Sequence, residues 1–436
     1  MANPYIPSWE HIPDGEPRVF GDRVYVYGSH DRTDSDRFCD YVLKVWSASV
    51  NDLNNWICHG VAFSTRTVKG HKADADWSDL ELYAPDVVEK DGKYYLYAYI
   101  LDSKGCVAVS DRPEGPFKLI SQYKYNIEKH YDNGTFIDPG VLVDDDGRVY
   151  IYCGFQGSYM AEINPDNMYE IIDGTYKENI IPVEKPHSFF EACSPRKIGD
   201  TYYLIYSPQI GSRLAYATSK SPTGPFIYRG VIIDNAIDYP GGNNHGSICC
   251  INGQWYIFYH RMTNGSIMSR IGCAEKIDIL PDGTIPMVEM TSSGMADSLN
   301  PYEITKADTA CVLTGGAIIT QKNVFDRVIT GITDKTVMGW KYFDFGHNSK
   351  SAITLSLKIR GMGCKGTIHV MLDDMCGKEI GTIAFGESDG VIETVVNNIT
   401  GRHSIFFKVE AGYTGWAAGM FENRYLFELE EFVFTI

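Results

Sequence analysis

The segment DGKYYLYAY, residues 91–99, joins a two-residue turn signal to a run of aromatic and aliphatic residues. Four further segments repeat this pattern: GDRVYVYGS from Gly21, DGRVYIYCG from Asp146, GDTYYLIYS from Gly199 and NGQWYIFYH from Asn252. A glycine beside Asp or Asn supplies the positive φ of a tight hairpin, and β-branched and aromatic residues suit a buried strand. Each segment therefore predicts a hairpin turn followed by a strand.

The five turns recur at a regular interval. Their glycines stand at positions 21, 92, 147, 199 and 253, so the intervals are 71, 55, 52 and 54 residues. Each interval has room for about four short strands with their turns. Five such repeats predict an all-β fold, a five-bladed β-propeller over about residues 5–295. Five unrelated hairpins in a sandwich are the alternative, which the regular period disfavours.

The last third of the chain lacks the repeat but still alternates in strand fashion. Examples are TVMGWKYFDFG, SAITLSLKIRG, GTIHVMLDD, GRHSIFFKVE and LFELEEFVFTI. About 135 residues of such strands predict a β-sandwich of the jelly-roll type. We therefore expect two domains, a propeller over residues 1–297 and a sandwich over residues 298–436.

Composition limits the partners. The 436 residues carry 39 Lys and Arg against 56 Asp and Glu, a formal net charge of −17, which argues against binding to nucleic acid or to an anionic membrane surface. No run of 18 apolar residues and no signal peptide is recognisable, so the location, cytoplasmic or secreted after loss of a leader, stays open. The 11 cysteines are an odd number without a CxxC pair, which favours reduced thiols over a disulfide framework or a zinc site.

One polar residue precedes each turn glycine at a similar distance. The offsets are 7 residues for Asp14, 6 for Asp86, 9 for Asp138, 8 for Glu191 and 8 for His245. If the innermost strand of each blade begins at the same mouth of the channel, these side chains converge on one pocket. A single acid at the start of a strand is usually a solvated turn residue, but five polar residues at equivalent offsets favour a functional site.

Clustered carboxyls suit glycoside hydrolysis. Neighbouring carboxylates spread one another's pKa values, so that one stays protonated while another is ionised. One then protonates the leaving oxygen, and the other activates water or attacks the sugar directly. Aromatic residues near the polar positions are candidate pocket walls, although packing in the core is the alternative for each: Tyr83, Phe136, Phe155, Phe189 and Phe190.

These motifs resemble the family 43 glycoside hydrolases, five-bladed propellers that include β-xylosidases, α-L-arabinofuranosidases and arabinanases. The opening NPYIPSWEHIPDGEPRVFGDRVYVYGSHD is similar to their first blade, which implies that Asp14 is the general base, with Glu16 as an alternative. FIDPGVLVDDDGRVYIY is similar to the third blade, which implies that Asp138 raises the pKa of the acid and orients it. FFEACSPRKIGDTYYLIYS is similar to the fourth, which implies that Glu191 is the general acid.

The resemblance implies roles for further residues. LYAPDVVEKDGKYYLYAY places Asp86 as a ligand of a sugar hydroxyl, with Tyr83, Phe136, Phe155 and Phe190 also predicted to bind substrate. NNHGSICCINGQWYIFYHR places His245 beneath the pocket, where it holds a central calcium ion or a water molecule, while the chemistry itself needs no cofactor. Arg261 is predicted to bind the acid or the sugar.

The C-terminal strands resemble the family 6 carbohydrate-binding modules, notably in YFDFG, GRHSIFFKVEAG and LFELEEFVF. Trp416, in the loop before the last strand, is a candidate platform for stacking on sugar. A loop anchor packed against the propeller is the equal alternative.

The predicted function is an exo-acting, inverting hydrolase that removes arabinofuranosyl or xylosyl units from arabinoxylan or from xylo- or arabino-oligosaccharides. Inversion requires about 6.5–9.5 Å between the Asp14 and Glu191 carboxyls, whereas a retaining enzyme needs about 5 Å. The alternatives are a non-catalytic propeller lectin and a propeller glycosidase for another sugar, such as a galactosidase or an arabinanase. Paired acids argue against the lectin.

Overall fold

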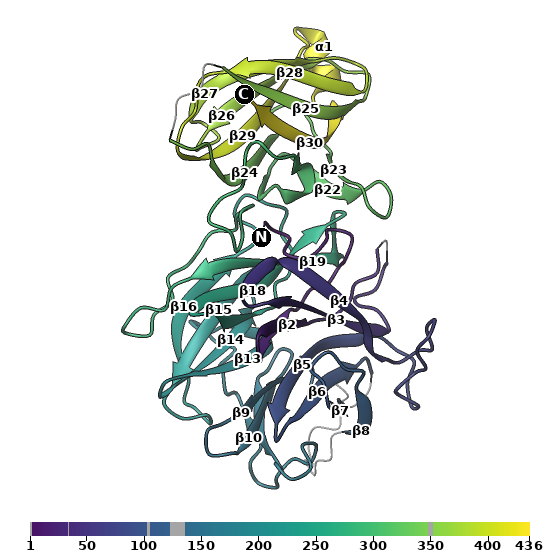
Figure 1. Ribbon diagram of the computed structural model, residues 1–436, viewed down its shortest axis with the longest axis vertical. Coiled ribbons are helices and arrows are strands. Elements are labelled where there is room, and N and C mark those ends of the chain that lie inside the picture. Colours follow the sequence, from purple (N-terminus) through teal and green to yellow (C-terminus); the bar gives the residue numbers. More distant parts are fainter. Residues whose placement is uncertain (1, 34, 103–104, 123–135, 348–351) are drawn as a thin grey trace.

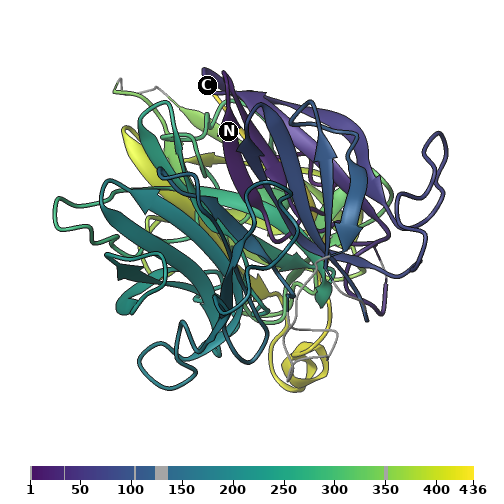
Figure 2. The ribbon, with the colours of Figure 1, turned by 90° about the horizontal axis from the view of Figure 1, so that it is seen from below.

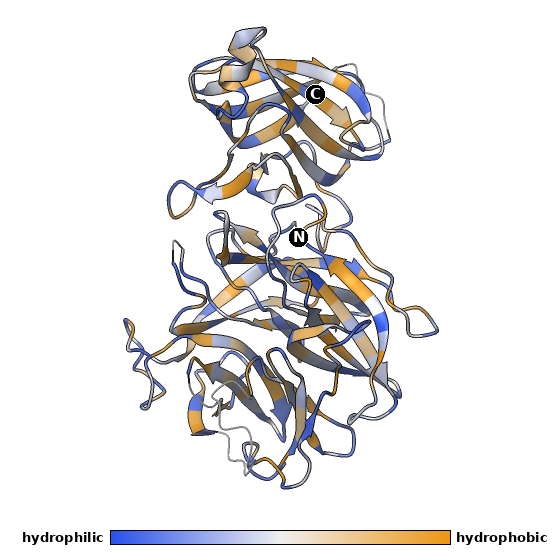
Figure 3. Cartoon of the chain, turned by 180° about the vertical axis from the view of Figure 1, so that it is seen from behind, coloured by the Kyte–Doolittle hydropathy of each residue, from blue (hydrophilic) through white to orange (hydrophobic). Residues whose placement is uncertain are grey.

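The computed structural model describes residues 2–33, 35–102, 105–122, 136–347 and 352–436. Two all-β units follow one another along the long axis of the molecule, with the C-terminal unit above the larger N-terminal one in Figure 1. Figure 3 shows that the strands carry most of the hydrophobic residues, while the connecting loops are largely hydrophilic. The predicted all-β class is therefore confirmed.

The N-terminal unit is a ring of five antiparallel sheets in the described part of the chain (Figure 1). The first blade holds β1 (Glu16–Phe20), β2 (Arg23–Tyr27), β3 (Val42–Ser49) and β4 (Asp52–Ser64). The second holds β5 (Leu82–Lys90), β6 (Lys93–Ile100), β7 (Cys106–Ser110) and β8 (Lys118–Gln122). The third holds β9 (Gly140–Val143), β10 (Val149–Cys153), β11 (Tyr159–Ile163) and β12 (Lys177–Glu178). The fourth holds β13 (Phe189–Ile198), β14 (Thr201–Pro208), β15 (Arg213–Ser219) and β16 (Ile227–Asp234), and the fifth holds β17 (Ser247–Ile251), β18 (Gln254–Thr263) and β19 (Ser266–Ile277).

The first strand of each blade is the innermost one. In the ring, β1 contacts β5 and β17, β5 contacts β9, β9 contacts β13, and β17 contacts β14. A parallel bridge between Gly15 and Gly246 joins the first and fifth blades. The five-bladed propeller is therefore confirmed, although the fifth sheet has three strands within the described residues instead of about four. After Ile277 the chain runs along the fourth blade, where Val288 bridges Ile233.

The repeated turns connect the first two strands of every blade, as predicted. Gly21, Gly92, Gly147, Gly199 and Gly253 all have positive φ angles, between 56° and 86°. An added Cβ would meet nothing at any of these glycines, so the backbone conformation alone calls for glycine. The strands on either side are buried aromatic and β-branched runs such as RVYVY in β2 and VYIYC in β10.

The C-terminal unit is a sandwich of two antiparallel sheets. The larger sheet holds β22 (Ile318–Gln321), β23 (Arg327–Thr330), β30 (Phe427–Thr435), β25 (Ile353–Gly361) and β28 (Gly390–Val396) in that order, with β20 (Thr305–Lys306) paired to β30. The other holds β21 (Val312–Leu313), β24 (Val337–Asp344), β29 (Arg402–Ala411), β26 (Gly366–Leu372) and β27 (Lys378–Phe385). The helical elements in the described residues are the 3-10 turn Ala307–Thr309 and the helix α1 (Trp416–Phe421), and α1 projects beyond the outline of the propeller in Figure 2.

The segment between β19 and β20, residues 278–304, joins the two units, and the predicted boundary after residue 297 lies in it and stays a prediction. One hydrophobic cluster continues across the junction. It includes Ile257 and Tyr259 of the fifth blade together with Cys311, Val312 and Trp340 of the sandwich. Burial of this shared apolar surface holds the two units together.

All eleven cysteines are free thiols in the structure, and only Cys58 and Cys376 are exposed. The expectation of reduced thiols is therefore confirmed. No helix in the described residues has the length and hydrophobicity needed to cross a membrane.

Candidate active site

A cavity of about 270 Å³ lies where the innermost strands begin. Four of the five polar residues predicted to converge line it: Asp14, Asp138, Glu191 and His245. Two further polar residues, Asn243 and Arg270, share the lining, and the remaining lining residues are apolar or aromatic: Phe38, Tyr83, Leu101, Ile137 and Phe155. The site thus combines titratable groups with apolar walls.

Asp14 stands two residues before β1 with a φ of 58°, a left-handed conformation that aspartate tolerates better than most residues. Its carboxylate accepts hydrogen bonds from Ser29 Oγ at 2.6 Å and from Arg270 Nη1 at 2.9 Å. Burial raises the pKa of Asp14, but the charge of Arg270 outweighs burial and holds the pKa well below its usual range. Asp14 is therefore ionised near neutral pH.

Arg270 is held in place by a second buried carboxylate. Its Nε and Nη2 atoms donate to the two oxygens of Asp31, each at 2.9 Å. The main-chain N–H of Arg270 also donates to Asp31 Oδ2 at 3.0 Å. Paired contacts of this kind fix the plane of a guanidinium. Asp31 therefore positions the cation that keeps Asp14 ionised.

Glu191 lies near the start of β13, where the ladder with β14 shifts register on both sides of it. An isolated bridge also joins Glu191 to Phe155 of the neighbouring blade. Burial, together with the negative charge of Asp14, raises the pKa of Glu191 to about 7, although Arg270 lowers it. A carboxyl with such a pKa retains its proton in a large fraction of molecules at neutral pH.

Asp138 lines the same cavity as Asp14 and Glu191. Burial, and then the charges of Glu191 and Asp14, raise the pKa of Asp138 well above its usual range. Two buried carboxyls close together resist double ionisation, so Asp138 and Glu191 share protons as a pair. The charge of Asp14 also raises the pKa of Glu191, and the predicted effect of Asp138 on that pKa stays a prediction. The orienting role of Asp138 stays a prediction.

His245 lines the cavity with Nδ1 at 3.7 Å from Asp14 Oδ1. Burial lowers the pKa of His245 to about 4, so the imidazole is neutral at pH 7. Calcium prefers six to eight oxygen ligands. Within the described residues no three His, Cys, Asp or Glu side chains form a group able to hold a metal, and the nearby Asp14 oxygen is already paired with Arg270. These residues do not fit a calcium site built by the protein, so the calcium at His245 stays a prediction without support from its surroundings.

The aromatic predictions divide into two groups. Tyr83 and Phe155 line the cavity, and Phe155 is 45% exposed. Phe190 does not line the cavity but packs against Phe155 with ring centroids 5.1 Å apart. Phe136 is only 2% exposed and belongs to the hydrophobic core between the second and third blades. The prediction that Phe136 contacts substrate is therefore wrong, because the core encloses its ring.

Asp86 does not reach the cavity, which corrects the prediction of a sugar ligand. Arg18 Nε and Nη2 bind its two oxygens at 3.0 and 2.6 Å, and the N–H of Val141 donates to Oδ2 at 2.7 Å. Its side chain is enclosed. Of the five predicted polar residues, Asp86 lies closest in sequence to its turn glycine, at 6 residues. In the second blade Tyr83, 9 residues before that glycine, lines the cavity, as Asp138 does at the same offset in the third blade.

Arg261 is also a correction. Its guanidinium is fully buried and faces the sandwich, where Nη1 donates to the carbonyl of Ala310 at 2.6 Å and Nη2 to that of Asp308 at 2.7 Å. Arg261 therefore joins the two units and binds neither the acid nor the sugar. Glu16, the alternative base, is bound to Arg196 Nη2 at 2.5 Å and does not line the cavity.

Sequence reasoning missed Arg270, Asn243 and three apolar residues of the wall. Arg270 lies in β19, outside the innermost strands, and Asn243 lies in the loop before β17 that also holds His245. A search for one polar residue per blade, 6 to 9 residues before the turn glycine, passes over both. An arginine in the otherwise small and apolar run SRIGCA was a usable signal for Arg270. Arg261 is likewise an arginine in a mainly apolar run, YIFYHRMT, but its guanidinium faces the sandwich and not the cavity, so this signal alone does not identify a site residue.

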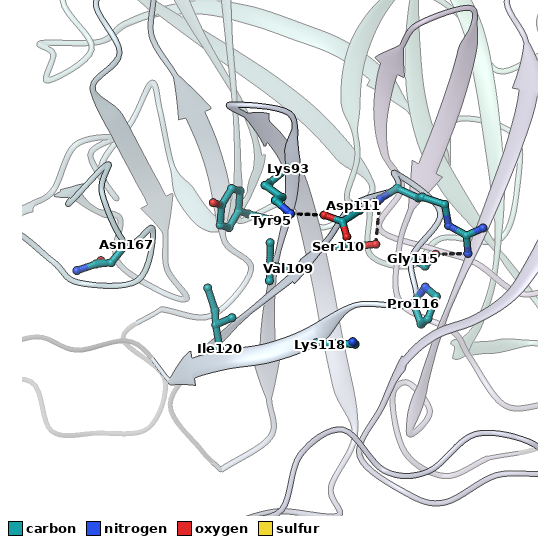
Figure 4. Close-up of a pocket in the computed structure, with 11 residues that line it drawn as sticks. Lys93, Tyr95, Val109, Ser110, Asp111, Gly115, Pro116, Lys118, Ile120 and Asn167 are labelled. Carbon is teal, nitrogen blue, oxygen red and sulfur yellow. Dashed lines mark hydrogen bonds and ion pairs between the residues drawn. The ribbon is translucent and has the colours of Figure 1, made fainter.

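A larger pocket of about 590 Å³ lies on the second blade, away from the channel (Figure 4). Its lining contains Lys93, Asp111 and Arg112. Lys93 pairs with Asp111, and Arg112 Nη2 donates to the carbonyl of Gly115 at 2.9 Å, as the dashed lines show. This lining has a single carboxylate, already paired with a lysine, and therefore lacks the two carboxyls that acid–base chemistry on a glycoside needs.

Comparison with known proteins agrees with this geometry. The profile described as "Glycosyl hydrolases family 43" matches residues 13–285, which include all the polar residues of the cavity. A xylosidase/arabinosidase of Thermoclostridium stercorarium is 41% identical over 427 residues, covering 84% of the chain and 87% of the relative.

Two solved structures resemble the chain. A β-xylosidase/α-arabinofuranosidase from a compost microbial metagenome, in complex with xylotriose, is 31% identical with a TM-score of 0.56, covering 66% of the chain and 97% of that protein. An arabinoxylan arabinofuranohydrolase of Bacillus subtilis, in complex with cellotetraose, covers 99% of the chain and 97% of that protein with a TM-score of 0.57. At 24% identity the second likeness concerns the fold alone.

Proposed function

The chain belongs to glycosyl hydrolase family 43 and is an O-glycoside hydrolase, and on that premise we propose that it releases single arabinofuranosyl or xylosyl units with inversion at the anomeric carbon. The observation that carries this proposal is the pairing in one cavity of an ionised Asp14 with a Glu191 whose pKa is raised to about 7. Inverting hydrolysis needs a base and an acid in these two states at the same pH.

The proposed reaction is a single displacement. Asp14 takes a proton from a water molecule as the water oxygen attacks the anomeric carbon. Glu191 gives its proton to the glycosidic oxygen as the bond to the leaving group breaks. Asp14 ends protonated and Glu191 ionised, and proton exchange with solvent restores both. Asp138, whose pKa is raised by burial and by its carboxylate neighbours, is proposed to orient Glu191.

The size of the cavity supports exo action. Pockets for drug-sized ligands measure about 300–1,000 Å³. A cavity of about 270 Å³ suits a terminal or side-chain sugar and is too small for a long stretch of polysaccharide. Phe38, Tyr83 and Phe155 give it faces on which the apolar side of a sugar ring can stack.

The proposed substrates are arabinoxylan and xylo- or arabino-oligosaccharides. Relatives named xylosidase/arabinosidase, β-xylosidase and arabinoxylan arabinofuranohydrolase support this substrate class. The walls of the cavity are mainly aromatic and aliphatic, and in this proposal they accommodate either arabinofuranose or xylose. Activity on both sugars is therefore expected, with one preferred.

The acid assignment is tested by Glu191→Gln with two kinds of leaving group. General acid catalysis contributes about 10²–10⁴-fold to a rate. We expect Glu191→Gln to lose at least that factor in kcat on xylobiose or an arabinoxylo-oligosaccharide, and much less on 4-nitrophenyl glycosides, whose leaving group needs little protonation. Glu178→Gln, the same change at an exposed carboxyl of β12 outside the cavity, serves as the control. Full activity of Glu191→Gln on xylobiose would show that Glu191 is not the acid.

A further inference from the structure

The loop GGNNH, residues 241–245, places in the cavity one side chain, that of Asn243, to which the proposed reaction gives no role. Asn243 lines the cavity and is partly exposed there. Its neighbours are otherwise fixed. Asn235 Nδ2 donates to the main-chain oxygen of Asn243 at 3.2 Å, and Asn244 Oδ1 accepts from the N–H of His260 at 3.3 Å.

Two main-chain groups determine which nitrogen of His260 carries the proton. The N–H of Asp14 donates to Nδ1 at 3.3 Å, so Nδ1 accepts, and Asp14 Oδ1, also 3.3 Å from Nδ1, receives no proton from it. The carbonyl oxygen of Asn243 lies 3.1 Å from Nε2, so Nε2 must donate. A main-chain N–H is always a donor and a carbonyl always an acceptor. His260 is therefore neutral with its proton on Nε2, which agrees with the lowering of its pKa by burial.

The state of His260 in turn fixes the amide of Asn243. The side-chain oxygen Oδ1 of Asn243 also lies 3.1 Å from Nε2 and shares its proton with the carbonyl. Turning the amide over would place NH₂ against N–H, two donors facing one another. The NH₂ group therefore points away from His260. Among the described residues none accepts a hydrogen bond from Asn243 Nδ2.

We propose that Asn243 Nδ2 donates a hydrogen bond to a hydroxyl of the sugar held in the cavity, and that His260 positions it. This inference rests on the proposed function. One imidazole binds the main chain of Asp14 on one side and orients the amide of Asn243 on the other. His260 thereby holds the base Asp14 and the sugar-binding amide of Asn243 at a fixed distance from each other, as an in-line attack by water on the sugar requires.

The test combines two Asn243 variants with substrates that lack one hydroxyl. Asn243→Ala removes the amide, while Asn243→Asp keeps an acceptor for His260 Nε2 and removes the donor. The substrates are the 4-nitrophenyl β-D-xyloside or α-L-arabinofuranoside, whichever the wild type hydrolyses faster, and its monodeoxy analogues. On the parent glycoside we expect each variant to lose about tenfold in kcat/KM, the scale of one neutral hydrogen bond. On one monodeoxy analogue the loss falls below about twofold, because the hydroxyl is already absent.

Asn235→Ala is the matched control, since Asn235 supports the same loop through the carbonyls of Asn243 and His260 but does not line the cavity. Its effect should be equal across all the analogues. Equal losses by the Asn243 variants on every analogue, or no loss on the parent, would overturn the inference while leaving the proposed function standing. A wild type that hydrolyses neither parent glycoside would overturn both.

Discussion

Replacing Arg270 with glutamine removes the cation that keeps Asp14 ionised. Arg270 Nη1 lies 2.9 Å from Asp14 Oδ1 in a buried setting. At an effective dielectric of about 20, unit charges this far apart attract by about 6 kcal/mol, which corresponds to about four pKa units. Burial alone raises the pKa of a carboxyl. In Arg270→Gln we therefore expect the pKa of Asp14 to move from well below its usual range to above the ordinary value of about 3.9.

The pH profile reports this change directly. Activity requires Asp14 ionised and Glu191 protonated, so kcat/KM falls below the pKa of Asp14 and above that of Glu191. In the wild type the acid limb lies below the accessible range and the alkaline limb lies near pH 7. Arg270 also lowers the pKa of Glu191, so its loss moves the alkaline limb up as well. Both limbs of Arg270→Gln are therefore displaced to higher pH.

The assay is kcat/KM on xylobiose and an arabinoxylo-oligosaccharide between pH 3 and 9, because these leaving groups need the proton of Glu191. Arg270→Gln also leaves Asp31 as a buried charge without its cation, a change that costs about 3–5 kcal/mol of stability. The double variant Asp31→Asn with Arg270→Gln avoids that cost and should show the same displaced limbs with a restored free energy of unfolding. A profile of the double variant that superimposes on the wild type would refute the electrostatic account.

Three further outcomes are expected. Arg261→Met leaves the carbonyls of Asp308 and Ala310 without their buried donor, so the free energy of unfolding in urea should fall by about 2–4 kcal/mol, while kcat on nitrophenyl glycosides stays unchanged. The control is Arg148→Met at an exposed site, and a loss of kcat without a loss of stability would contradict the role of Arg261 in joining the two units. Trp416 is 82% exposed, so it is not a loop anchor packed against the propeller. If Trp416 stacks on sugar, Trp416→Ala should weaken binding to insoluble arabinoxylan about fivefold, the effect of one aromatic contact of about 1 kcal/mol. Unchanged binding in a sedimentation assay would show that Trp416 is not a platform for sugar. Dialysis against EDTA should leave kcat and the pH profile unchanged, since acid, base and guanidinium supply the charges, and activity restored by calcium after such dialysis would contradict this.

The fold was predictable because its signal is local and repeated. A turn glycine with positive φ and an apolar strand after it recur five times, and each recurrence in the structure is the first hairpin of a blade. The three-stranded fifth sheet was not predictable from the period. After Ile277 the chain runs along the fourth blade, where Val288 bridges Ile233, and this course depends on tertiary contacts that the repeat does not encode.

The site was predictable where a residue lies at the start of the innermost strand or just before it. Asp14, Asp138, Glu191 and His245, at 7 to 9 residues before their glycines, all line the cavity. Asp86, at an offset of 6, does not. An offset error of one or two residues changes both the depth and the face of a strand residue.

Other parts of the site depend on contacts that no strand pattern encodes. Arg261 and Arg270 are buried cations of two adjacent strands, but one binds carbonyls of the sandwich side and the other binds Asp14. The orientation of Asn243 follows from the proton position on His260, which in turn follows from two main-chain groups. Only the assembled structure brings these groups together.

The most direct test of the mechanism is the anomeric configuration of the first product. Proton NMR spectra recorded within minutes of adding enzyme to 4-nitrophenyl β-D-xyloside, before mutarotation, should show α-xylose first, and the α-L-arabinofuranoside should give β-arabinofuranose. These results follow from Asp14 delivering water to the face opposite the leaving group that Glu191 protonates. Release of β-xylose as the first product would show retention and would contradict the assignment of Asp14 as a general base.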